Sequence, residues 1–394
     1  MIANVPKIGV FALNISPKSG GVYNLIDGLM AHAQYSKYNY LYLSQTRPMD
    51  IPLPSNVETI TRHPLIRMTN QVVLRTSKLN TLFRHRNAAI AALAACSGIS
   101  PGVIATPRAW LWPHCFGLIP NLAGMVPICH DMIHYKYPEN FDRSAHMRRA
   151  TAESSLMSCP SILCPSNSTA NDLLSVYPVL KSQVYVATES PCEIMEEDSH
   201  TVESQYLNDT YGKTPIFLYV GVDWPHKNHK LLIQAAVMLR AMTSKPFKVL
   251  LVGHRRSTNI TKEISCNPAC AGLVTDIGSV SRAMLAALYR HSTALVFPSL
   301  YEGFGIPLVE AMQYGLPIIA SDQSCVPEIC GNSAILLNPT LPSLWAHEML
   351  HLMTNKDHQM KQAVAAKAMS YNYSWQHTWQ QIDEVFTTVL ERGI

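Results

Sequence analysis

Short apolar runs alternate with amphipathic helical patterns along almost the whole chain. The runs are rich in valine, isoleucine and leucine without polar alternation, which is typical of strands covered on both faces of a parallel sheet. The runs expected as strands are 7–13, 38–43, 103–106, 126–130, 161–164, 183–186, 216–221, 249–253, 294–297 and 317–320. The patterns expected as helices are 21–35, 228–243, 282–291, 307–314 and 375–391. This alternation predicts an α/β fold of doubly wound parallel sheets.

Residues 191–215 interrupt the rhythm. Their sequence, PCEIMEEDSHTVESQYLNDTYGKTP, is polar, acidic and poor in periodicity, so we interpret it as an interdomain linker with one short helix. The linker separates two α/β domains, 1–195 and 196–373, and residues 374–394 follow as a last helical segment. Ligands of open α/β sheets bind beyond the carboxyl ends of the strands, so candidate chemistry is sought there.

Composition narrows the class of protein. The chain has 394 residues, of which 47% are hydrophobic and 15% charged, and this argues for large cores and against disorder. No apolar run approaches the ~18 residues of a spanning helix, and the first residues are interpreted as a buried strand rather than a signal peptide, so we expect a cytoplasmic protein. None of the ten cysteines lies in a CxxC motif. Free thiols are therefore expected, and no metal site.

Basic residues are concentrated in one interval of the first half. No acidic residue occurs between Glu58 and Asp131. The interval 62–108 carries Arg62, Arg67, Arg75, Lys78, Arg84, Arg86 and Arg108. A field of one sign favours an anionic partner, and a solvated basic surface is the alternative.

The densest candidate chemistry lies in LVFPSLYEGFGIPLVEAMQYGLPIIASD, residues 295–322. Glu302 is expected in a loop after a strand, and Glu310 early on the next helix. Both carboxylates can then reach a ligand at the strand ends. The backbone at Phe304, Gly305 and Ile306 can approach closely, and the helix start offers N–H groups to an anion. Two ordinary solvated carboxylates are the alternative.

This arrangement resembles the E-x7-E signature of family 4 glycosyltransferases, which are retaining enzymes of the GT-B fold. The resemblance implies two facing Rossmann-like domains with an interdomain cleft. Domain 1–195 is then the acceptor side and 196–373 binds the nucleotide sugar, while 374–394 returns to the first domain after a turn at Ser374-Trp375. It also implies that Glu310 binds the ribose hydroxyls and that Glu302 lies by the transferred sugar. The amides at Phe304, Gly305 and Ile306 then contact sugar hydroxyls and phosphate.

A second segment, FLYVGVDWPHKNHKLLIQAA at 217–236, places Lys227 between a strand end and a helix start. A lysine there can neutralise a leaving diphosphate, whereas a solvated helix-flanking lysine is the alternative. The segment is similar to the family's diphosphate-binding loop, in which Lys227 takes the lysine position. Many family members have an arginine where this chain has His226 or Val222. Lys227 is therefore expected to carry the charge alone when His226 is neutral.

Two further sites are expected from the first domain. Gly20-Gly21 lies between the first strand and helix, in the position of the family's glycine-rich loop, with a plain tight turn as the alternative. His130-Asp131 closes a buried strand in VPICHDMIHYKYPENF, which resembles the HD segment of bacterial mannosyltransferases. The resemblance brings His130 to the donor sugar with Asp131 as its orienting partner, and a core histidine is the alternative. Ser166 and Ser168 are expected to cap a helix.

The predicted function is a metal-independent, retaining hexosyl transfer from a nucleotide sugar onto a glycan or lipid-linked acceptor in polysaccharide biosynthesis. The resemblance favours GDP-mannose as donor, with a UDP-sugar next, and implies no other cofactor and no protein nucleophile. A base-binding role is expected near Gly278–Val280. The interval 62–108 is a candidate for peripheral docking at the inner face of the membrane, and no nucleic-acid partner is expected. The alternatives are a nucleotide-sugar 2-epimerase, a non-catalytic scaffold and, less favoured, a glycoside phosphorylase.

Overall fold

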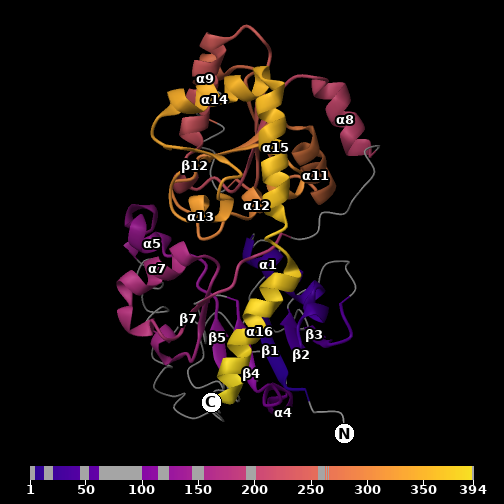
Figure 1. The fold of residues 1–394 in the computed structure, drawn as a ribbon, viewed down its shortest axis with the longest axis vertical. Coiled ribbons are helices and arrows are strands. Elements are labelled where there is room, and N and C mark those ends of the chain that lie inside the picture. The colour runs from indigo at the N-terminus through magenta and orange to yellow at the C-terminus, as the bar shows by residue number, and fades with distance from the viewer. Residues whose placement is uncertain are drawn as a thin grey trace. The chain divides into compact units, whose positions relative to one another are not determined.

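The computed structural model describes residues 5–12, 21–44, 53–61, 100–113, 124–143, 155–191, 201–255, 262, 264 and 266–392. The chain divides into two compact units (Figure 1). Unit 1 comprises Met1–Cys192 together with Ser374–Ile394, and unit 2 comprises Glu193–Tyr373. None of the described helices is both long and apolar enough to cross a bilayer.

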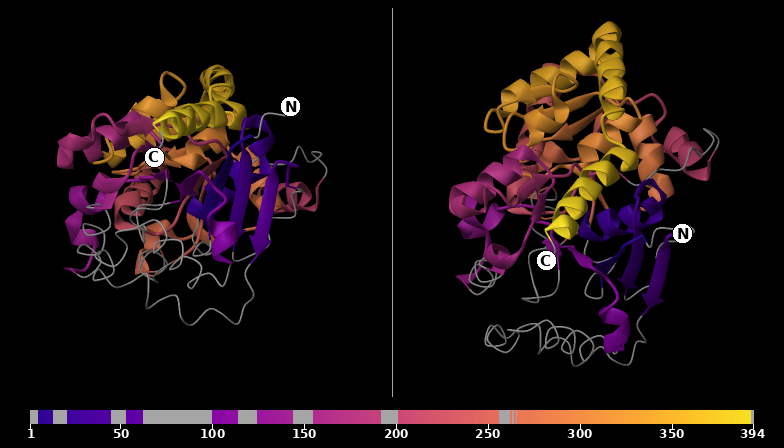
Figure 2. Two further views of the ribbon diagram at one scale, coloured as in Figure 1. Left: turned by 90° about the horizontal axis from the view of Figure 1, so that it is seen from below. Right: turned by 60° about the horizontal axis from the view of Figure 1, so that its bottom comes forward.

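A parallel sheet forms the centre of unit 1. Its strands are β1 (Lys7–Ala12), β2 (Asn39–Ser44), β3 (Val57–Thr61), β4 (Ala109–Trp112) and β5 (Met125–Pro127). Their order is β3-β2-β1-β4-β5, and they lie side by side in Figure 2. The pair β6 (Ile162–Cys164) and β7 (Val184–Val186) joins β5 through a parallel bridge between Ile128 and Leu163. The chain order reverses between β1 and β4, which makes that point the topological switch point of this sheet.

The helices of unit 1 come from two separate parts of the chain, one before and one after unit 2. They are α1 (Gly21–Ala31), α4 (Pro101–Ile104), α5 (Ile133–Lys136), α7 (Asn167–Val176) and α16 (Trp375–Glu391). The Ser166 hydroxyl caps α7 by accepting from the Thr169 amide, whereas Ser168 lies inside the helix. On α16 the buried indole of Trp379 donates to the Leu29 carbonyl at 3.1 Å, and the Asp383 carboxylate accepts from Ser36 and the Lys37 amide. Residues more than 340 positions apart in sequence thus share one core.

A six-stranded parallel sheet forms the centre of unit 2. Its strands are β8 (Ile216–Val220), β9 (Lys248–Val252), β10 (Val274–Gly278), β11 (Ala294–Phe297), β12 (Ile318–Ser321) and β13 (Ile335–Leu337). The order is β10-β9-β8-β11-β12-β13. The helices are α8 (Val202–Tyr211), α9 (His229–Met242), α11 (Arg282–His291), α12 (Ile306–Gln313), α13 (Val326–Cys330), α14 (Pro342–Thr354) and α15 (Lys356–Ser370). The chain order reverses between β8 and β11, so ligand chemistry is expected where these two strands end.

One predicted strand is wrong. Residues 103–106 were expected to be extended, but Pro101–Ile104 form the short helix α4 and the strand β4 follows it. Pro101 is at the first helical position, where its fixed φ favours a helix start. An apolar run of four residues does not by itself distinguish a strand from a buried helical turn.

Candidate active site

The loops that follow β8 and β11 meet at the carboxyl edge of the unit 2 sheet. The Leu300 amide donates to the His226 carbonyl at 2.7 Å. Asn228 has a left-handed backbone, with φ of 56°, and its amide nitrogen donates to the carbonyls of Pro298 at 3.2 Å and Pro339 at 2.8 Å. These bonds fix the loop that carries Lys227 against the loop that carries Glu302.

Lys227 and Glu302 form an ion pair at this edge. The lysine Nζ donates to Glu302 Oε1, and the two side chains are only 16% and 9% exposed. The same Nζ lies 5.8 Å from the centre of the Phe297 ring. A charge so poorly hydrated interacts strongly with any partner that reaches it. Lys227 and Glu302, the first of the two predicted carboxylates, therefore form one ion pair at the switch point of this sheet.

The loop after β12 supports the backbone of Glu302. Ser324 has a φ of 58°, and its hydroxyl accepts from the Glu302 amide at 3.2 Å and donates to the Glu302 carbonyl at 2.6 Å. The Cys325 thiol donates to the Phe304 carbonyl at 3.2 Å. Burial raises the pKa of Cys325 well above its ordinary value, which keeps the thiol protonated as a donor. Sequence reasoning had not assigned Ser324 or Cys325 a role.

Gly305 and Ile306 form the start of α12. Gly305 has a φ of 92°, and a Cβ there would lie 2.9 Å from the Leu308 side chain, so the turn requires glycine. The helix begins at Ile306, with Pro307 in its first turn. Pro307 has no N–H, and the Leu308 amide donates to the Gly305 carbonyl at 2.9 Å. The amides of Ile306 and Val309 are therefore the remaining first-turn donors. They can bind an anion because the helix dipole also favours negative charge there.

Glu310 lies in the second turn of α12, where Tyr289 of α11 holds it. The Tyr289 hydroxyl donates to Glu310 Oε2 at 2.7 Å, and the Tyr289 ring stacks on Tyr314 with centroids 5.5 Å apart. Burial raises the pKa of Glu310, although the Tyr289 hydrogen bond and the Arg282 charge act in the opposite direction. The carboxylate is therefore oriented by an aromatic neighbour. Sequence reasoning had not identified Tyr289.

A second cation, Arg255, lies beyond the end of β9. Its guanidinium donates to Asp276 Oδ1 at 2.7 Å and to the carbonyls of Leu251 at 3.0 Å and Gly221 at 3.4 Å. A Cβ on Gly253 would lie 2.1 Å from the Gly221 carbonyl oxygen, so the two strand ends almost touch. Arg255 therefore holds the start of the Lys227 loop. Sequence reasoning had not identified Arg255. The feature that could have marked it is its position two residues after a strand-end glycine, in LLVGHR.

His130 lies at the carboxyl end of the unit 1 sheet, after β5. Its Nε2 is 2.6 Å from the Pro113 carbonyl oxygen, and its Nδ1 is 3.5 Å from Glu189 Oε1. Burial acts to lower the pKa of His130, but the hydrogen bond and charge of Glu189 and the Pro113 carbonyl outweigh it, so the pKa is raised. Both ring nitrogens thus face acceptors, which favours the imidazolium.

The predicted partner of His130 has a different contact from the one expected. Asp131 Oδ1 accepts from the Ile133 amide at 3.1 Å, which holds the turn into α5, and it acts on His130 through its charge. The hydrogen-bonding carboxylate is Glu189, which sequence reasoning missed because 59 positions separate it from His130 in the sequence. Gly21 is the first residue of α1. Gly20, and 62–99 within the basic interval, lie outside the described residues.

Comparisons with known proteins extend this description. The family described as Glycosyl transferases group 1 matches residues 207–369. The O-antigen chain mannosyltransferase RfbU of Salmonella typhimurium is 28% identical over 228 residues, covering 58% of this chain and 60% of that protein. The O-antigen chain mannosyltransferase B of Escherichia coli is 26% identical over 274 residues, covering 68% and 71%. The chain thus spans less than two thirds of the Salmonella relative.

Solved structures agree on the fold. A sucrose-phosphate synthase from Thermosynechococcus elongatus aligns with a TM-score of 0.73 and 16% identity, over 98% of this chain and 100% of that one. WaaG, a glycosyltransferase of lipopolysaccharide biosynthesis, aligns with a TM-score of 0.67 and 13% identity, over 96% and 99%. The predicted fold class, a GT-B arrangement of two Rossmann-like parallel sheets, is confirmed.

Proposed function

We propose that the protein is a retaining hexosyltransferase of polysaccharide biosynthesis, because residues 207–369 match the family described as Glycosyl transferases group 1. Its substrates are a nucleotide sugar and a glycan or lipid-linked acceptor. The observation that carries the proposal is the poorly hydrated Lys227–Glu302 pair at the switch point of the unit 2 sheet. The O-antigen mannosyltransferases similar to this chain support the biosynthetic role.

In this proposal Lys227 binds the diphosphate of the donor. Departure of the nucleoside diphosphate places negative charge on its oxygens, and a fixed cation stabilises that charge without reorganisation. The amides of Ile306 and Val309 at the start of α12 add uncharged donors. When the phosphate arrives, Lys227 is shared between it and Glu302. The leaving phosphate oxygen accepts the proton of the acceptor hydroxyl, so no protein nucleophile is needed.

Glu310 binds the ribose in the same proposal. A carboxylate accepts hydrogen bonds from both hydroxyls of a ribose. Tyr289 occupies Oε2 from one side, which leaves Oε1 for the ligand and fixes its direction. His130 is assigned to the donor sugar by the resemblance, and its raised pKa makes it a suitable cation.

We propose GDP-mannose as the donor because both relatives described above are named mannosyltransferases. A UDP-sugar is the second candidate, since the Anabaena protein Alr3699/HepE shares this fold and was solved in complex with UDP and glucose. A thermal-shift panel of GDP-, UDP-, ADP- and dTDP-sugars tests the choice, because a ligand that binds only the folded state raises Tm. A GDP-sugar is expected to give the largest shift. A larger shift with any other nucleotide contradicts the assignment.

The reaction class is tested by products. A transferase releases nucleoside diphosphate only when an acceptor is present, apart from slow hydrolysis, whereas a 2-epimerase changes the sugar without one. We expect turnover to require an acceptor and to continue in a chelator, since Lys227 and the α12 amides supply the stabilising charge. Epimerised nucleotide sugar in the absence of acceptor contradicts the proposal.

Acceptor delivery is assigned to the basic interval 62–108, which we propose docks the enzyme on the cytoplasmic face of the membrane. The interval is free of acidic residues, and polybasic segments bind anionic lipid. Sedimentation with vesicles that contain or lack an anionic lipid tests this. Binding is expected only with the anionic lipid and is expected to weaken as salt increases. Equal recovery in the supernatant with both vesicles contradicts docking.

A further inference from the structure

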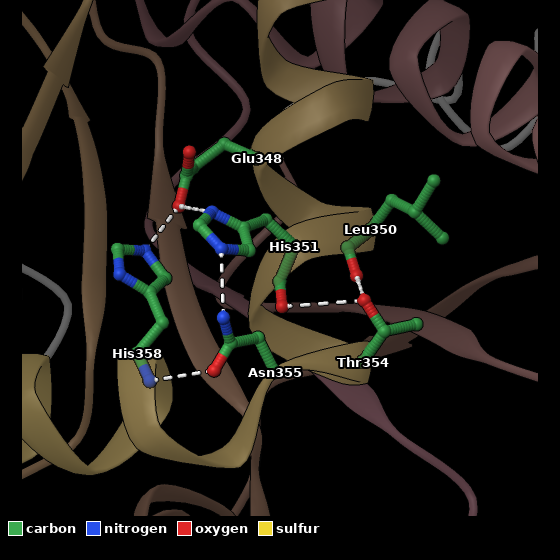
Figure 3. Close-up of polar contacts among 6 residues, drawn as sticks. All are labelled: Glu348, Leu350, His351, Thr354, Asn355 and His358. Atoms are coloured by element: carbon green, nitrogen blue, oxygen red, sulfur yellow. Dashed lines mark hydrogen bonds and ion pairs between the residues drawn. The ribbon is translucent and has the colours of Figure 1, made fainter.

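The corner between α14 and α15 brings together two histidines and a glutamate (Figure 3). Glu348 and His351 are three residues apart on α14, a spacing that places them on one helix face. Asn355 follows and caps α15, because its Oδ1 accepts from the His358 amide at 2.9 Å. The cap turns the chain back so that the His358 side chain reaches Glu348.

Glu348 Oε1 is the centre of this group. It lies 2.6 Å from His358 Nε2 and 3.7 Å from His351 Nδ1. The two imidazoles are stacked, with centroids 4.0 Å apart and planes inclined by 8°. One ligand atom from each of the three side chains lies within 4.8 Å of the others, and in the part of the chain that the structure describes no other trio of histidine, cysteine or acidic residues does so.

We propose that Glu348, His351 and His358 form a binding site for a zinc ion. Two imidazoles and one carboxylate are ligands that zinc prefers, whereas magnesium and calcium prefer oxygen atoms alone. His351 is 46% exposed, so a fourth position remains for water. Tetrahedral zinc with bonds of about 2.1 Å separates its ligand atoms by about 3.4 Å. Binding therefore requires His358 to move back from Glu348 and the two rings to leave their stack.

Asn355 controls the proton of His351. Since its Oδ1 caps α15, its NH2 group faces His351 Nε2 at 3.2 Å and donates to it. That bond leaves the imidazole proton on Nδ1, the atom that zinc needs. Zinc binding at Nδ1 therefore requires the proton to leave Nδ1 and Nε2 to take up a proton from solvent, and this exchange breaks the Asn355 bond. An acceptor in place of the NH2 group would instead hold a proton on Nε2 and free the Nδ1 lone pair.

The site has a structural role in the domain. Gln359 of α15 donates to the carbonyl of Thr293 at 3.4 Å, and Thr293 directly precedes β11. The corner thus lies at the amino edge of the sheet, opposite the edge of Lys227 and Glu302. α14 packs against α9 and α15 packs against α12, the helices that follow the two site loops. A zinc ion would join α14 to α15 and stabilise unit 2 without touching substrate.

Zinc titration of the full chain, free of affinity tags, tests the proposal. The chain has 16 histidines, so the comparison between variants decides, not binding alone. The double variant His351→Asn with His358→Asn is expected to weaken one tight site at least tenfold and to abolish the zinc-dependent rise in Tm. His347→Asn, an exposed histidine beside Glu348 on the same helix, is the matched control and is expected to behave as wild type. Equal affinity in wild type and the double variant overturns the proposal.

A variant that is expected to bind zinc more tightly distinguishes loss of the site from misfolding of the variant. Asn355→Asp keeps a good helix cap and places a carboxylate oxygen at His351 Nε2. It is expected to tighten zinc binding about tenfold, the scale on which outer-sphere carboxylates act. Unchanged or weaker binding in Asn355→Asp overturns the arrangement. Wild-type affinity in a Glu348→Gln variant overturns it also, because the carboxylate is the shared ligand. Magnesium in place of zinc is expected to leave Tm unchanged.

Discussion

Lys227 is held in an ion pair with the carboxylate of Glu302. Its Nζ donates to Glu302 in a site where both side chains are mostly buried. Removing one member of such a pair leaves the other charged and poorly solvated. A change in this ion pair is therefore expected to alter both the folding stability and the catalytic rate, so variants of Lys227 need to be measured for both.

Replacing Lys227 with alanine is expected to lower kcat/KM about 10²–10³-fold, because removal of one fixed group that stabilises transition-state charge has that effect. Steady-state kinetics with the donor identified by thermal shift would measure it, and Tm would report any loss of folding. Lys230→Ala, an exposed lysine in the first turn of α9, is the matched control and is expected to keep wild-type rates. Near-normal turnover of Lys227→Ala would remove this residue from the mechanism.

Glu310→Ala is expected to weaken nucleotide affinity by about one to two orders of magnitude, which is the scale of charged hydrogen bonds lost to a ribose. Calorimetric titration with the nucleoside diphosphate measures this change directly. Tyr289→Phe keeps the ring stacked on Tyr314 but removes the hydroxyl that orients the carboxylate, so a smaller loss is expected. An unchanged dissociation constant in Glu310→Ala would contradict the ribose assignment.

His229 gives the molecule an acid sensitivity. Burial is the main cause that lowers the pKa of His229 to about 4, against an ordinary 6.5. Between these values the unfolded chain binds a proton that the folded chain does not, so stability is unaffected above about pH 6.5 and falls as the pH drops toward 4. Urea unfolding at pH 7 and pH 5 should show this loss, and His229→Gln should show less of it. The same loss in both proteins would argue against His229 as the source.

At the scale of elements, the site depends on loops that support one another. The loop after β8 is bonded to the loop after β11, which in turn lies on the loop after β12 through Ser324. Three consecutive positions along the sheet edge thus carry one assembly, in which Glu302 is the central member. A change in the third loop should reach the ion pair without touching it.

Ser324→Gly tests this coupling. Glycine tolerates the φ of 58° but lacks the hydroxyl that bonds both backbone groups of Glu302. Two lost hydrogen bonds are expected to cost about 1–3 kcal/mol of stability, with kcat lowered more than donor affinity. Denaturant unfolding and kinetics together measure both effects. Ser343→Gly, a serine in the first turn of α14, serves as a control for the added glycine. Wild-type kcat in Ser324→Gly would show that the loop is not a support.

Most strands could be predicted from sequence, whereas β4 and three edge strands could not. Runs such as 216–221 and 294–297 are apolar on both faces and became β8 and β11. The pattern missed β4, because it placed that strand at 103–106. It also missed β3, β10 and β13, which lie at sheet edges, where one neighbour is absent and polar residues are tolerated. Helices α11 and α16 have the bounds that were expected, because Ser281 and Ser374 cap them.

Only part of the candidate site could be predicted from the sequence, because some of its residues lie in local motifs and others act through contacts between separate segments. Lys227, Glu302 and Glu310 lie in local motifs, and their strand-end context is readable from the chain. Glu189 and Tyr289 act through contacts between separate segments, which no local pattern encodes. Arg255 is marked in the sequence only by its position two residues after a strand-end glycine. The structure therefore adds the groups that orient the predicted ones: a carboxylate for His130, a phenol for Glu310 and a guanidinium for the Lys227 loop.

At the scale of the whole molecule, unit 1 depends on α16. Trp379 is fully buried, packs 5.0 Å from the Tyr40 ring centre and donates to Leu29. Trp379→Ala is expected to cost about 3–5 kcal/mol, as do other large-to-small core changes. Amide hydrogen exchange would locate the loss, with protection falling in β1 and β2 and unchanged in β8 and β11. Gln376→Ala, an exposed neighbour on α16, is the control. Uniform loss of protection in both sheets would contradict independent cores.

The place of α16 in the sequence has a consequence for biosynthesis. The ribosome releases every residue of unit 2 before the helix that closes the core of unit 1. The part of unit 1 that precedes residue 193 therefore keeps its apolar α16-facing surface uncovered until α16 has been translated. A nascent polypeptide arrested before residue 374 would display that surface to chaperones, whereas unit 2 would already have its complete sequence.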